Sequence, residues 1–264
     1  MKIGVTGITG RMGRAIARIV DNDPIVQLTS GLVRRGNGFD GADIGEFLGG
    51  DPNSRQITSN INDFFAQCDA VIDFSSPVLS LQCAQLAAQH RKVFVCGTTG
   101  FSDEEKSVLR KYSKNTVVIW SSNMSIGVNL LISLTEKVSS ILRDDFDIEI
   151  VEMHHKNKVD SPSGTALSLG AAAAKGRNVD LQKSAVMSRV GNETKRNRGE
   201  IGFAALRGGD VIGDHSVIFA GDGERIELTH KATDRTVFAS GAVRAAIWGS
   251  NQNPGFYLMK DVLS

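Results

Sequence analysis

The first half of the chain alternates short apolar runs with longer amphipathic patterns. Between Arg11 and Asp21 the apolar residues recur at helical spacing, which predicts a helix with one buried face. The runs that predict buried strands are Lys2 to Thr6, Ile25 to Leu32, Asp69 to Phe74, Val93 to Cys96 and Val117 to Trp120. Parallel strands need crossover connections, so strands that alternate with helices predict an α/β fold with a doubly wound, mostly parallel sheet.

The segment from Gly36 to Asn60 interrupts this alternation. It is rich in Gly, Asp, Asn and Ser, which favour turns over regular elements. We expect a surface loop there with one short strand near Ile57, and the pattern assigns the segment no chemistry.

Past Asn123 the apolar positions follow a different order. A long helical run from Gly127 to Arg143 is followed by a strand-like run from Phe146 to Met153 and an Ala-rich helical run from Ala166 to Lys175. The next strand-like runs are Ile201 to Leu206, Val211 to Phe219 and Arg225 to Thr229. Because turn sequences join these runs directly, they predict a smaller α+β domain with an antiparallel or mixed sheet. The helical run from Arg235 to Gly249 could join either domain.

Composition and charge restrict the class of protein. The chain has 264 residues, of which 41% are hydrophobic and 22% charged, so it can form one large or two modest packed domains. Its formal net charge of +1 gives no broad attraction to nucleic acid or to an anionic membrane, and we expect neither as a partner. The apolar runs are shorter than a membrane span, and glycines break the N-terminal run that a signal peptide would need.

The three cysteines are Cys68, Cys83 and Cys96, an odd number without CxxC spacing. This pattern argues against a disulfide framework and a thiolate zinc site, and it favours a reducing cytoplasm. Cys96 could be a nucleophile like that of semialdehyde dehydrogenases, or a buried thiol at a strand end. We favour the buried thiol.

Three glycines follow the first strand directly and open the first helix. Gly7, Gly10 and Gly13 form the sequence GITGRMG. Glycines at such a turn let a pyrophosphate approach the backbone and let helix and strand pack closely, and the helix N-terminus adds amide donors. The spacing GxxGxxG departs from GxGxxG, and glycines can mark a tight turn alone. Their place between strand and helix indicates a dinucleotide site.

The end of the second strand bears on the choice of cofactor. NAD-preferring sites usually present an acid about twenty residues past the glycines, whereas this chain has Arg34 and Arg35. Guanidinium groups pair well with a 2′-phosphate, so we expect NADPH as the preferred cofactor, NADH as a second option, and Arg34 as the first contact. The alternative is that both arginines are solvated loop charges.

Two polar clusters follow later strands. GTTG spans Gly97 to Gly100, and SSNMS spans Ser121 to Ser125. Both should lie at carboxyl ends of parallel strands, where backbone amides and hydroxyls can meet the nicotinamide ribose or carboxamide. Either cluster alone is also compatible with simple turns.

The strongest signal for chemistry is the segment EMHHKNKVDSPSGTAL, from Glu152 to Leu167. It follows a predicted strand and precedes a predicted helix, where open α/β sheets place their chemistry. Free amide N–H groups at the helix start, the Thr165 hydroxyl and the helix dipole favour a carboxylate or phosphate near Lys158. The alternative is an ordinary N-cap beside a surface basic run.

Two adjacent histidines, His154 and His155, lie in this segment. In an extended chain their side chains point to opposite faces, so we expect them to have different roles. Adjacent histidines do not easily bind one zinc ion, and no HExxH motif or cysteine set completes such a site, so we expect no metal. A proton-transfer role for His154 or Lys158 is the more economical interpretation.

Together these motifs resemble the 4-hydroxy-tetrahydrodipicolinate (dihydrodipicolinate) reductase family of diaminopimelate and lysine biosynthesis. The resemblance covers GxxGRMG, Asp73 and Phe74 with Ser75, GTTG, SxNxSxGVN and E-x-HH-x-x-K-x-D-x-PSGTA, and it runs nearly end to end. It implies a Rossmann-like dinucleotide-binding domain of residues 1–124 and 235–264, to which the last long helix returns. It also implies a substrate-binding and oligomerisation domain of residues 125–234 and a homotetramer.

The resemblance further implies an NAD(P)H-dependent oxidoreductase that converts 4-hydroxy-tetrahydrodipicolinate, a small cyclic dicarboxylate, to tetrahydrodipicolinate by hydride transfer. It makes His154 and Lys158 candidate proton donors, and it makes Lys158 a stabiliser of negative charge. The implied substrate contacts are His155, Gly164 and Thr165. The implied cofactor contacts are Gly7, Ile8, Thr9, Gly10, Arg11, Met12, Arg34, Gly97, Thr98, Thr99, Ser121, Ser122, Asn123 and Met124. Val33 stands where members that use both cofactors often have an acid, which weakens any inference of NADH use.

Two other functions fit parts of the pattern. One is another NAD(P)-dependent oxidoreductase of amino-acid metabolism, such as a semialdehyde or homoserine dehydrogenase. Cys96 does not support this function, because we favour a buried thiol there over a nucleophile. The other is a redox-sensing module that binds NADPH without turnover. The HHKNK sequence argues against the second, because binding alone does not need it.

Overall fold

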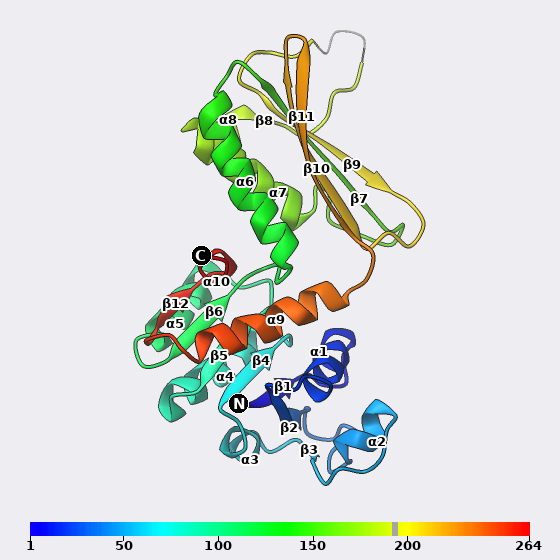
Figure 1. Cartoon of the computed structure of the whole chain (residues 1–264), viewed down its shortest axis with the longest axis vertical. Coiled ribbons are helices and arrows are strands. Elements are labelled where there is room, and N and C mark those ends of the chain that lie inside the picture. The colour runs from blue at the N-terminus through cyan, green and yellow to red at the C-terminus, as the bar shows by residue number, and fades with distance from the viewer. Residues whose placement is uncertain (192–194) are drawn as a thin grey trace. The chain divides into compact units, whose positions relative to one another are not determined.

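The computed structural model describes residues 1–191 and 195–264 of the chain. Within them, strands and helices alternate in the first half, and consecutive strands follow in the second (Figure 1). The chain divides into two compact units, Met1–Ile126 together with Arg235–Ser264, and Gly127–Asp234. Of the described helices, none is both long enough and apolar enough to cross a membrane.

The first unit contains a seven-stranded sheet in the order β12-β6-β5-β4-β1-β2-β3, and every pairing in it is parallel. Its strands are β1 (Lys2–Thr6), β2 (Gln27–Leu32), β3 (Ile57–Thr58), β4 (Ala70–Asp73), β5 (Val93–Cys96), β6 (Val117–Trp120) and β12 (Gly255–Tyr257). The chain adds β2 and β3 on one side of β1 and then β4 on the other. The switch point, where such folds bind ligands, therefore lies between the carboxyl ends of β1 and β4.

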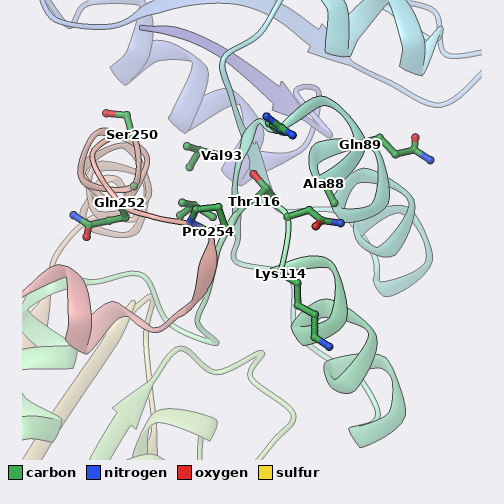
Figure 2. A pocket seen from close by; sticks show the side chains of 12 residues that line it. Ala88, Gln89, Val93, Lys114, Thr116, Ser250, Gln252 and Pro254 are labelled. Carbon is green, nitrogen blue, oxygen red and sulfur yellow. The ribbon is translucent and has the colours of Figure 1, made fainter.

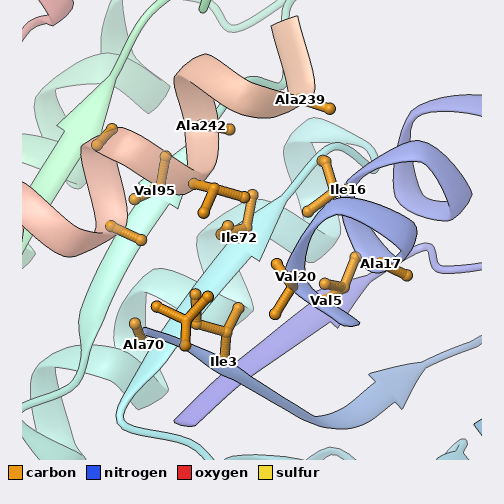
Figure 3. Close-up of a cluster of buried hydrophobic side chains, with 14 of the residues drawn as sticks. Ile3, Val5, Ile16, Ala17, Val20, Ala70, Ile72, Val95, Ala239 and Ala242 are labelled. Carbon is orange, nitrogen blue, oxygen red and sulfur yellow. The ribbon is translucent and has the colours of Figure 1, made fainter. Parts of the chain in front are cut away.

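Helices cover both faces of this sheet. They are α1 (Arg11–Asp21), α2 (Ile44–Leu48), α3 (Ile61–Ala66), α4 (Pro77–His90), α5 (Asp103–Tyr112), α9 (Thr236–Gly249) and α10 (Met259–Val262). Figure 3 shows Ile3 and Ile72 of the sheet packed beneath α1 and α9. Side chains alternate between the two faces of a strand, so Val71 of β4 and Phe94 of β5 point to the other face, where α3, α4 and α5 cover them. Burial on both faces explains the continuous apolar runs in the sequence.

The second unit contains a mixed five-stranded sheet in the order β11-β10-β7-β9-β8. Its strands are β7 (Asp147–His154), β8 (Ala185–Val186), β9 (Ile201–Arg207), β10 (Gly213–Gly221) and β11 (Glu224–Ala232). Strand β10 is antiparallel to β7 and β11, whereas β7 and β8 are parallel to β9. The helices of this unit are α6 (Ile126–Leu142), α7 (Gly164–Arg177) and α8 (Leu181–Ser184).

The burial pattern of β7 places two polar residues on its inner face. Ile148 and Ile150 pack in the core against Leu131 of α6 and Leu169 of α7 (elements labelled in Figure 1). Alternate residues of a strand share a face, so Glu152 and His154 continue the same buried row. The last residues of β7 therefore carry polar side chains from the core toward the loop that follows.

The structure confirms the expected fold class, a Rossmann-like parallel sheet with a smaller α+β part and a mixed sheet. Two expectations were incomplete. Strand β2 begins at Gln27 rather than Ile25, because the Asp23 carboxylate accepts hydrogen bonds from the first two amides of the run and forms a turn there. The segment 36–60, which we expected to be a loop with a strand near Ile57, also contains α2. Asp43 caps α2 by accepting from two amides in its first turn.

Candidate active site

The glycine turn after β1 has the geometry that a phosphate group requires. Gly7 has a φ of +59°, and a Cβ atom on Gly13 would lie 2.2 Å from the carbonyl oxygen of Gly7. Only glycine therefore lets α1 pack this closely on the turn. Gly10 is the N-cap of α1 and supplies no side-chain hydrogen bond to the first amides of the helix. Those N–H groups and the positive end of the helix dipole fit the pyrophosphate of a dinucleotide.

Next to this turn, a buried carboxylate ties several loops together. Asp73 ends β4 and is 0% exposed. It accepts hydrogen bonds from the hydroxyls of Thr6 and Ser80, from Ser75 Oγ at 2.6 Å and from Thr98 Oγ1 at 2.9 Å. These donors come from β1, from α4 and from the segments after β4 and β5. One carboxylate thus orders the carboxyl edge of the sheet, although the sequence showed Asp73 only as part of the family motif.

The expected cofactor residues lie at this carboxyl edge, but they differ in exposure. The side chains of Ile8 and Met124 are buried in the core, so only their backbone atoms can reach a ligand. Thr98 is also buried, with its hydroxyl on Asp73. The exposed residues are Gly10, Arg11, Arg34, Thr99 and Ser122, and the half-buried ones are Gly7, Thr9, Met12, Gly97, Ser121 and Asn123.

Cys96 ends β5 and points into the core, with its Sγ atom 3.6 Å from Asp73 Oδ2. Burial raises the pKa of the Cys96 thiol, and the charge of Asp73 adds to this shift. The thiol therefore stays protonated at neutral pH and is a poor nucleophile. The buried-thiol interpretation is confirmed.

The same unit contains a cavity of about 690 Å³. Val93, Lys114, Thr116 and Gln252 are among the residues that line it (Figure 2). Val93 begins β5 and Val117 begins β6, so this cavity lies at the amino edge of the sheet. The glycine turn and Asp73 lie at the opposite, carboxyl edge. The cavity therefore contains none of the residues expected to bind the cofactor.

In the second unit, the polar cluster is built around Glu152. Its carboxylate is 1% exposed and accepts from Arg207 Nη1 at 2.8 Å, from Arg207 Nη2 at 3.0 Å and from the Ser163 amide at 3.0 Å. His154 Nδ1 lies 2.5 Å from Glu152 Oε2. Burial alone would raise the pKa of Glu152, but the hydrogen bonds from Arg207, His154 and Ser163 lower it overall. The carboxylate is therefore ionised at neutral pH.

His154 packs edge-on against a second buried histidine. Its ring centroid lies 5.1 Å from that of His215, and His215 Nε2 lies 3.1 Å from Ser163 Oγ. Burial lowers the pKa of His154, which contact with Glu152 partly offsets. Burial also lowers the pKa of His215, to about 4, with the neighbouring His154 adding to the shift. Both imidazoles are therefore mainly neutral at neutral pH.

Lys158 lies in the loop after β7 and pairs with Asp160 at 2.8 Å. This contact lowers the pKa of Asp160. The charge of Lys158 also contributes to the lowered pKa of His154, after the larger effects of burial and Glu152. Arg207 Nη2 donates to the carbonyl oxygen of Asp160 at 2.6 Å, which holds the loop against β9. The loop thus keeps a cation near the imidazole.

The start of α7 completes the cluster. Ser163 is its N-cap and accepts from the Ala166 amide at 3.1 Å. Gly164 is exposed, and a Cβ built on it would meet no atom within 4 Å, so the space beside its Cα is open, while its backbone hydrogen bond helps lower the pKa of Asp160. Thr165 and His155 are half-buried. The amide end of a helix and a nearby lysine favour an anion.

The structure thus brings His154, Lys158 and the start of α7 into one unit, as the sequence segment suggested. Sequence reasoning missed Glu152, Arg207 and His215 as members of the cluster. The strand period could have revealed Glu152, because it lies two residues before His154 on β7. Arg207 and His215 depend on strand pairing, since Arg207 pairs with His154 and His215 with Glu152.

Solved structures of known proteins share this fold. A dipicolinate-bound dihydrodipicolinate reductase from Paenisporosarcina sp. TG-14 superposes with a TM-score of 0.78 at 23% identity, covering 98% of this chain and 97% of that chain. A scyllo-inositol dehydrogenase from Lactobacillus casei, with bound NAD(H) and scyllo-inositol, gives a TM-score of 0.58 at 14% identity over 100% and 93% of the two chains. At these identities the likeness concerns the fold.

Sequence comparisons identify the family. Residues 1–124 match the family model for the N-terminus of dihydrodipicolinate reductase, and residues 127–263 match the model for its C-terminus. The 4-hydroxy-tetrahydrodipicolinate reductase of Agrobacterium fabrum is 51% identical over 100% of this chain and 96% of its own length. The enzyme of that name from Ruegeria pomeroyi is 49% identical over 99% and 97% of the two chains. The chain therefore belongs to the dihydrodipicolinate reductase family.

Proposed function

We propose that the protein reduces 4-hydroxy-tetrahydrodipicolinate to tetrahydrodipicolinate in diaminopimelate and lysine biosynthesis. The observation that carries the proposal is the cluster of His154 and Lys158 beside the open start of α7, in a chain that belongs to this reductase family. The conversion replaces a hydroxyl group with hydrogen. The hydroxyl leaves as water together with a proton from the neighbouring ring carbon, which makes the ring conjugated, and this ring then takes up one hydride and one proton.

The substrate carries two carboxylates, and the second unit offers matching groups. We assign one carboxylate to the backbone of Gly164 and to Thr165 at the start of α7, where the helix dipole is positive. Lys158 adds a full charge, and half-buried His155 is the further proposed contact. A cation near the ring also offsets the negative charge that develops when a conjugated system accepts a hydride.

Proton transfer is assigned to Lys158 and His154. A bound reduced nicotinamide supplies the hydride. The lowered pKa of His154 keeps its imidazole neutral at neutral pH, whereas the Lys158 amino group lies 2.8 Å from Asp160 in an ion pair. Lys158 therefore delivers the proton, and His154 accepts or relays one at its Nε2 atom.

The chain is an oxidoreductase that uses a nicotinamide cofactor, and NADPH is the cofactor that we propose it prefers. Arg34 and Arg35 are exposed directly after β2, and the acid that usually contacts the ribose in NAD-preferring sites is replaced there by buried Val33. The backbone of residues 7–12 and the clusters at 97–99 and 121–124 are the remaining proposed contacts. A kcat/KM for NADH equal to or above that for NADPH would contradict this preference.

We also propose a homotetramer formed through the sheet of the second unit. The face of this sheet opposite the inward residues of β7 carries Val151 and Met153, which pair in register with Ala204 and Leu206 of β9. Leu206, near the end of β9, is 50% exposed, and an exposed large apolar side chain on a sheet face is a candidate interaction surface. The free cysteines support a cytoplasmic location. Light scattering of the purified chain tests the assembly, and a monomer would contradict it.

The decisive test of the activity is turnover with freshly generated 4-hydroxy-tetrahydrodipicolinate. We expect the absorbance of NADPH to fall only when both substrate and protein are present. NADPH that binds without being oxidised would contradict the proposal and would favour a redox-sensing module. Oxidation driven by an aldehyde substrate instead would favour another dehydrogenase class.

A further inference from the structure

One carboxylate contacts both ends of the loop that carries the proposed catalytic groups. Glu152 Oε2 lies 2.5 Å from His154 Nδ1, and Glu152 Oε1 accepts from the Ser163 amide at 3.0 Å. His154 is the last residue of β7, and Ser163 is the N-cap of α7. The loop between them contains Lys158. Its start and its end are therefore both held by a side chain on the preceding strand.

Arg207 supplies the positive charge that compensates the buried carboxylate of Glu152. It binds both oxygens of Glu152, at 2.8 and 3.0 Å, and also donates to the Asp160 carbonyl in the middle of the loop. A buried carboxylate without a partner would be strongly unfavourable, and a buried ion pair adds little net stability compared with apolar packing. The pair therefore suggests a positional rather than a stabilising role.

The ionised state of Glu152 also determines the tautomer of His154. An ionised carboxylate can only accept hydrogen bonds, so the Nδ1 atom at 2.5 Å must carry a proton. The Nε2 atom of the neutral ring then has a lone pair and is the atom that exchanges a proton. A Cβ atom on Gly213 would lie 3.0 Å from Nε2, so glycine at this position keeps that side of the ring uncrowded.

We propose that Glu152 and Arg207 are positioning residues: Glu152 holds His154 with its Nδ1 atom protonated and fixes the start of α7, and Arg207 keeps Glu152 in place. The proton-transfer group and the anion-binding helix start are thereby kept in one geometry. The inference rests on the proposed reductase activity for its kinetic consequence. The tautomer of His154 does not depend on that activity.

The charged and titratable groups around His154 come from several elements. Glu152 lies on β7, Lys158 in the following loop and Arg207 at the end of β9, and His215 on β10 packs against the ring. His230, on β11, pairs in register with His215. Among these groups Glu152 is the carboxylate that touches the imidazole. Its removal should therefore change the titration of His154 more than the loss of any other neighbour.

The variant Glu152→Gln tests the proposal because it keeps the shape and removes the charge. An amide cannot accept from His154 and Arg207 with both of its polar atoms, so the imidazole must turn or change its tautomer. We expect kcat to fall on the order of a hundredfold, with little change in NADPH affinity. The acid limb of the kcat profile should move to lower pH, because the lost carboxylate favoured the protonated imidazole.

The control is Glu149→Gln, which removes another carboxylate of β7 that pairs with Arg189 and Arg196 but contacts no histidine. It should leave kcat and the pH profile unchanged. Glu152→Asp retains the charge and should recover part of the lost activity. Kinetics of Glu152→Gln that match wild type would overturn the proposal.

Nitrogen NMR of the five histidines gives a readout that needs no turnover. The signal lost in His154→Asn identifies His154. We expect a protonated Nδ1 in wild type and a changed Nδ1 signal in Glu152→Gln. A wild-type His154 protonated at Nε2 alone would overturn the proposal even if Glu152→Gln does not fold. Wild-type protein that shows the expected tautomer but no turnover would contradict the reductase function and leave the positioning of His154 intact.

Discussion

The two units of the protein each contain a buried carboxylate, and the partners of the two differ. Asp73, in the parallel sheet, is surrounded by the hydroxyls of four Ser and Thr residues. Glu152, in the mixed sheet, binds the charged Arg207 and an imidazole. Both side chains are at most 1% exposed. Their burial is alike, so the chemistry of their partners must account for any difference in role.

Neutral donors can order loops without coupling them to a titrating group. The hydroxyls on Asp73 fix the edge where a dinucleotide phosphate is expected, and they add no positive charge there. Glu152 instead couples a permanent cation to His154, whose protonation state matters for proton transfer. From this contrast we expect changes around Glu152 to alter catalysis and its pH dependence. Changes around Asp73 should alter cofactor affinity.

The largest effect should come from Lys158→Ala, which removes the proposed proton donor beside the Glu152 cluster. We expect kcat to fall on the order of a thousandfold while NADPH affinity survives, because the lost interaction acts in the chemical step. Steady-state kinetics and a fluorescence titration measure the two quantities. Lys156→Ala, an exposed lysine in the same loop, is the matched control and should retain wild-type kcat. Equal losses in the two variants would remove the special role of Lys158.

Arg207→Leu should be the most destabilising of these changes. It leaves the buried carboxylate of Glu152 without its cation, which typically costs about 3 kcal/mol or more. Urea unfolding measures this loss. Arg225→Leu removes an exposed arginine paired with Glu227 and should cost about 0.5 kcal/mol. If the two variants were equally stable, the charged partner of Glu152 would be no more important than a surface ion pair.

The lowered pKa of His215 predicts that the protein loses stability in weak acid. The folded pKa is about 4 and the usual value is 6.5. Between these values the unfolded chain binds more protons, so this contribution is fully present above pH 6.5 and is lost as the pH falls toward 4. The loss amounts to about 3 kcal/mol. Glu152 contributes at lower pH, because its folded pKa lies below the usual 4.5: this stability is present above pH 4.5 and is lost as the pH falls from there through the folded pKa.

Unfolding midpoints from pH 7 to pH 4 test this expectation. His215→Gln keeps a polar side chain but cannot titrate, so its stability should vary less across the window. The lowered pKa of His154 also makes the protein less stable as the pH falls, so the stability of His215→Gln will keep part of its pH dependence. If the unfolding midpoint of His215→Gln changed with pH as much as that of wild type, His215 would not be buried as a neutral imidazole.

The smallest effect should come from Asp73→Asn. The amide accepts fewer hydroxyl protons, so the loops at the carboxyl edge lose part of their order, and we expect the Kd for NADPH to rise about tenfold, which corresponds to about 1.4 kcal/mol. The pH profile of kcat should not change. Asp69→Asn, at the other end of the same strand region, serves as the control and should keep wild-type affinity. If the pH profile of kcat shifted in Asp73→Asn, Asp73 and Glu152 would not differ in their effect on the pH dependence of catalysis.

The elements that the sequence predicted best are those whose apolar residues form an unbroken run or recur at regular spacing. Strand β1 and helix α1 have the bounds expected from their apolar patterns, because burial on both faces of the sheet leaves uninterrupted apolar runs. Helix α2 was missed because it spans five residues and depends on the Asp43 cap more than on an apolar face. Short, cap-dependent elements carry little periodicity to detect.

The residues of the candidate site also fall into two groups, those that the sequence placed together and those that it did not. His154, Lys158, Gly164 and Thr165 lie within one segment, so their grouping was visible in the sequence. Arg207 follows Glu152 by 55 positions and reaches it because β9 pairs with β7. Strand pairing across such a distance cannot be derived from local patterns. The partners that determine the charge and tautomer of the site therefore became visible only in the fold.

We expect the cluster of the second unit to serve the reduction of a cyclic hydroxy-dicarboxylate. The most direct measurement is product analysis by mass spectrometry, with NADPH oxidation recorded on the same sample of 4-hydroxy-tetrahydrodipicolinate. We predict one product molecule, lighter than the substrate by one oxygen atom, for each NADPH oxidised. NADPH oxidation without that product, or unchanged substrate beside bound NADPH, would contradict the proposed reductase function.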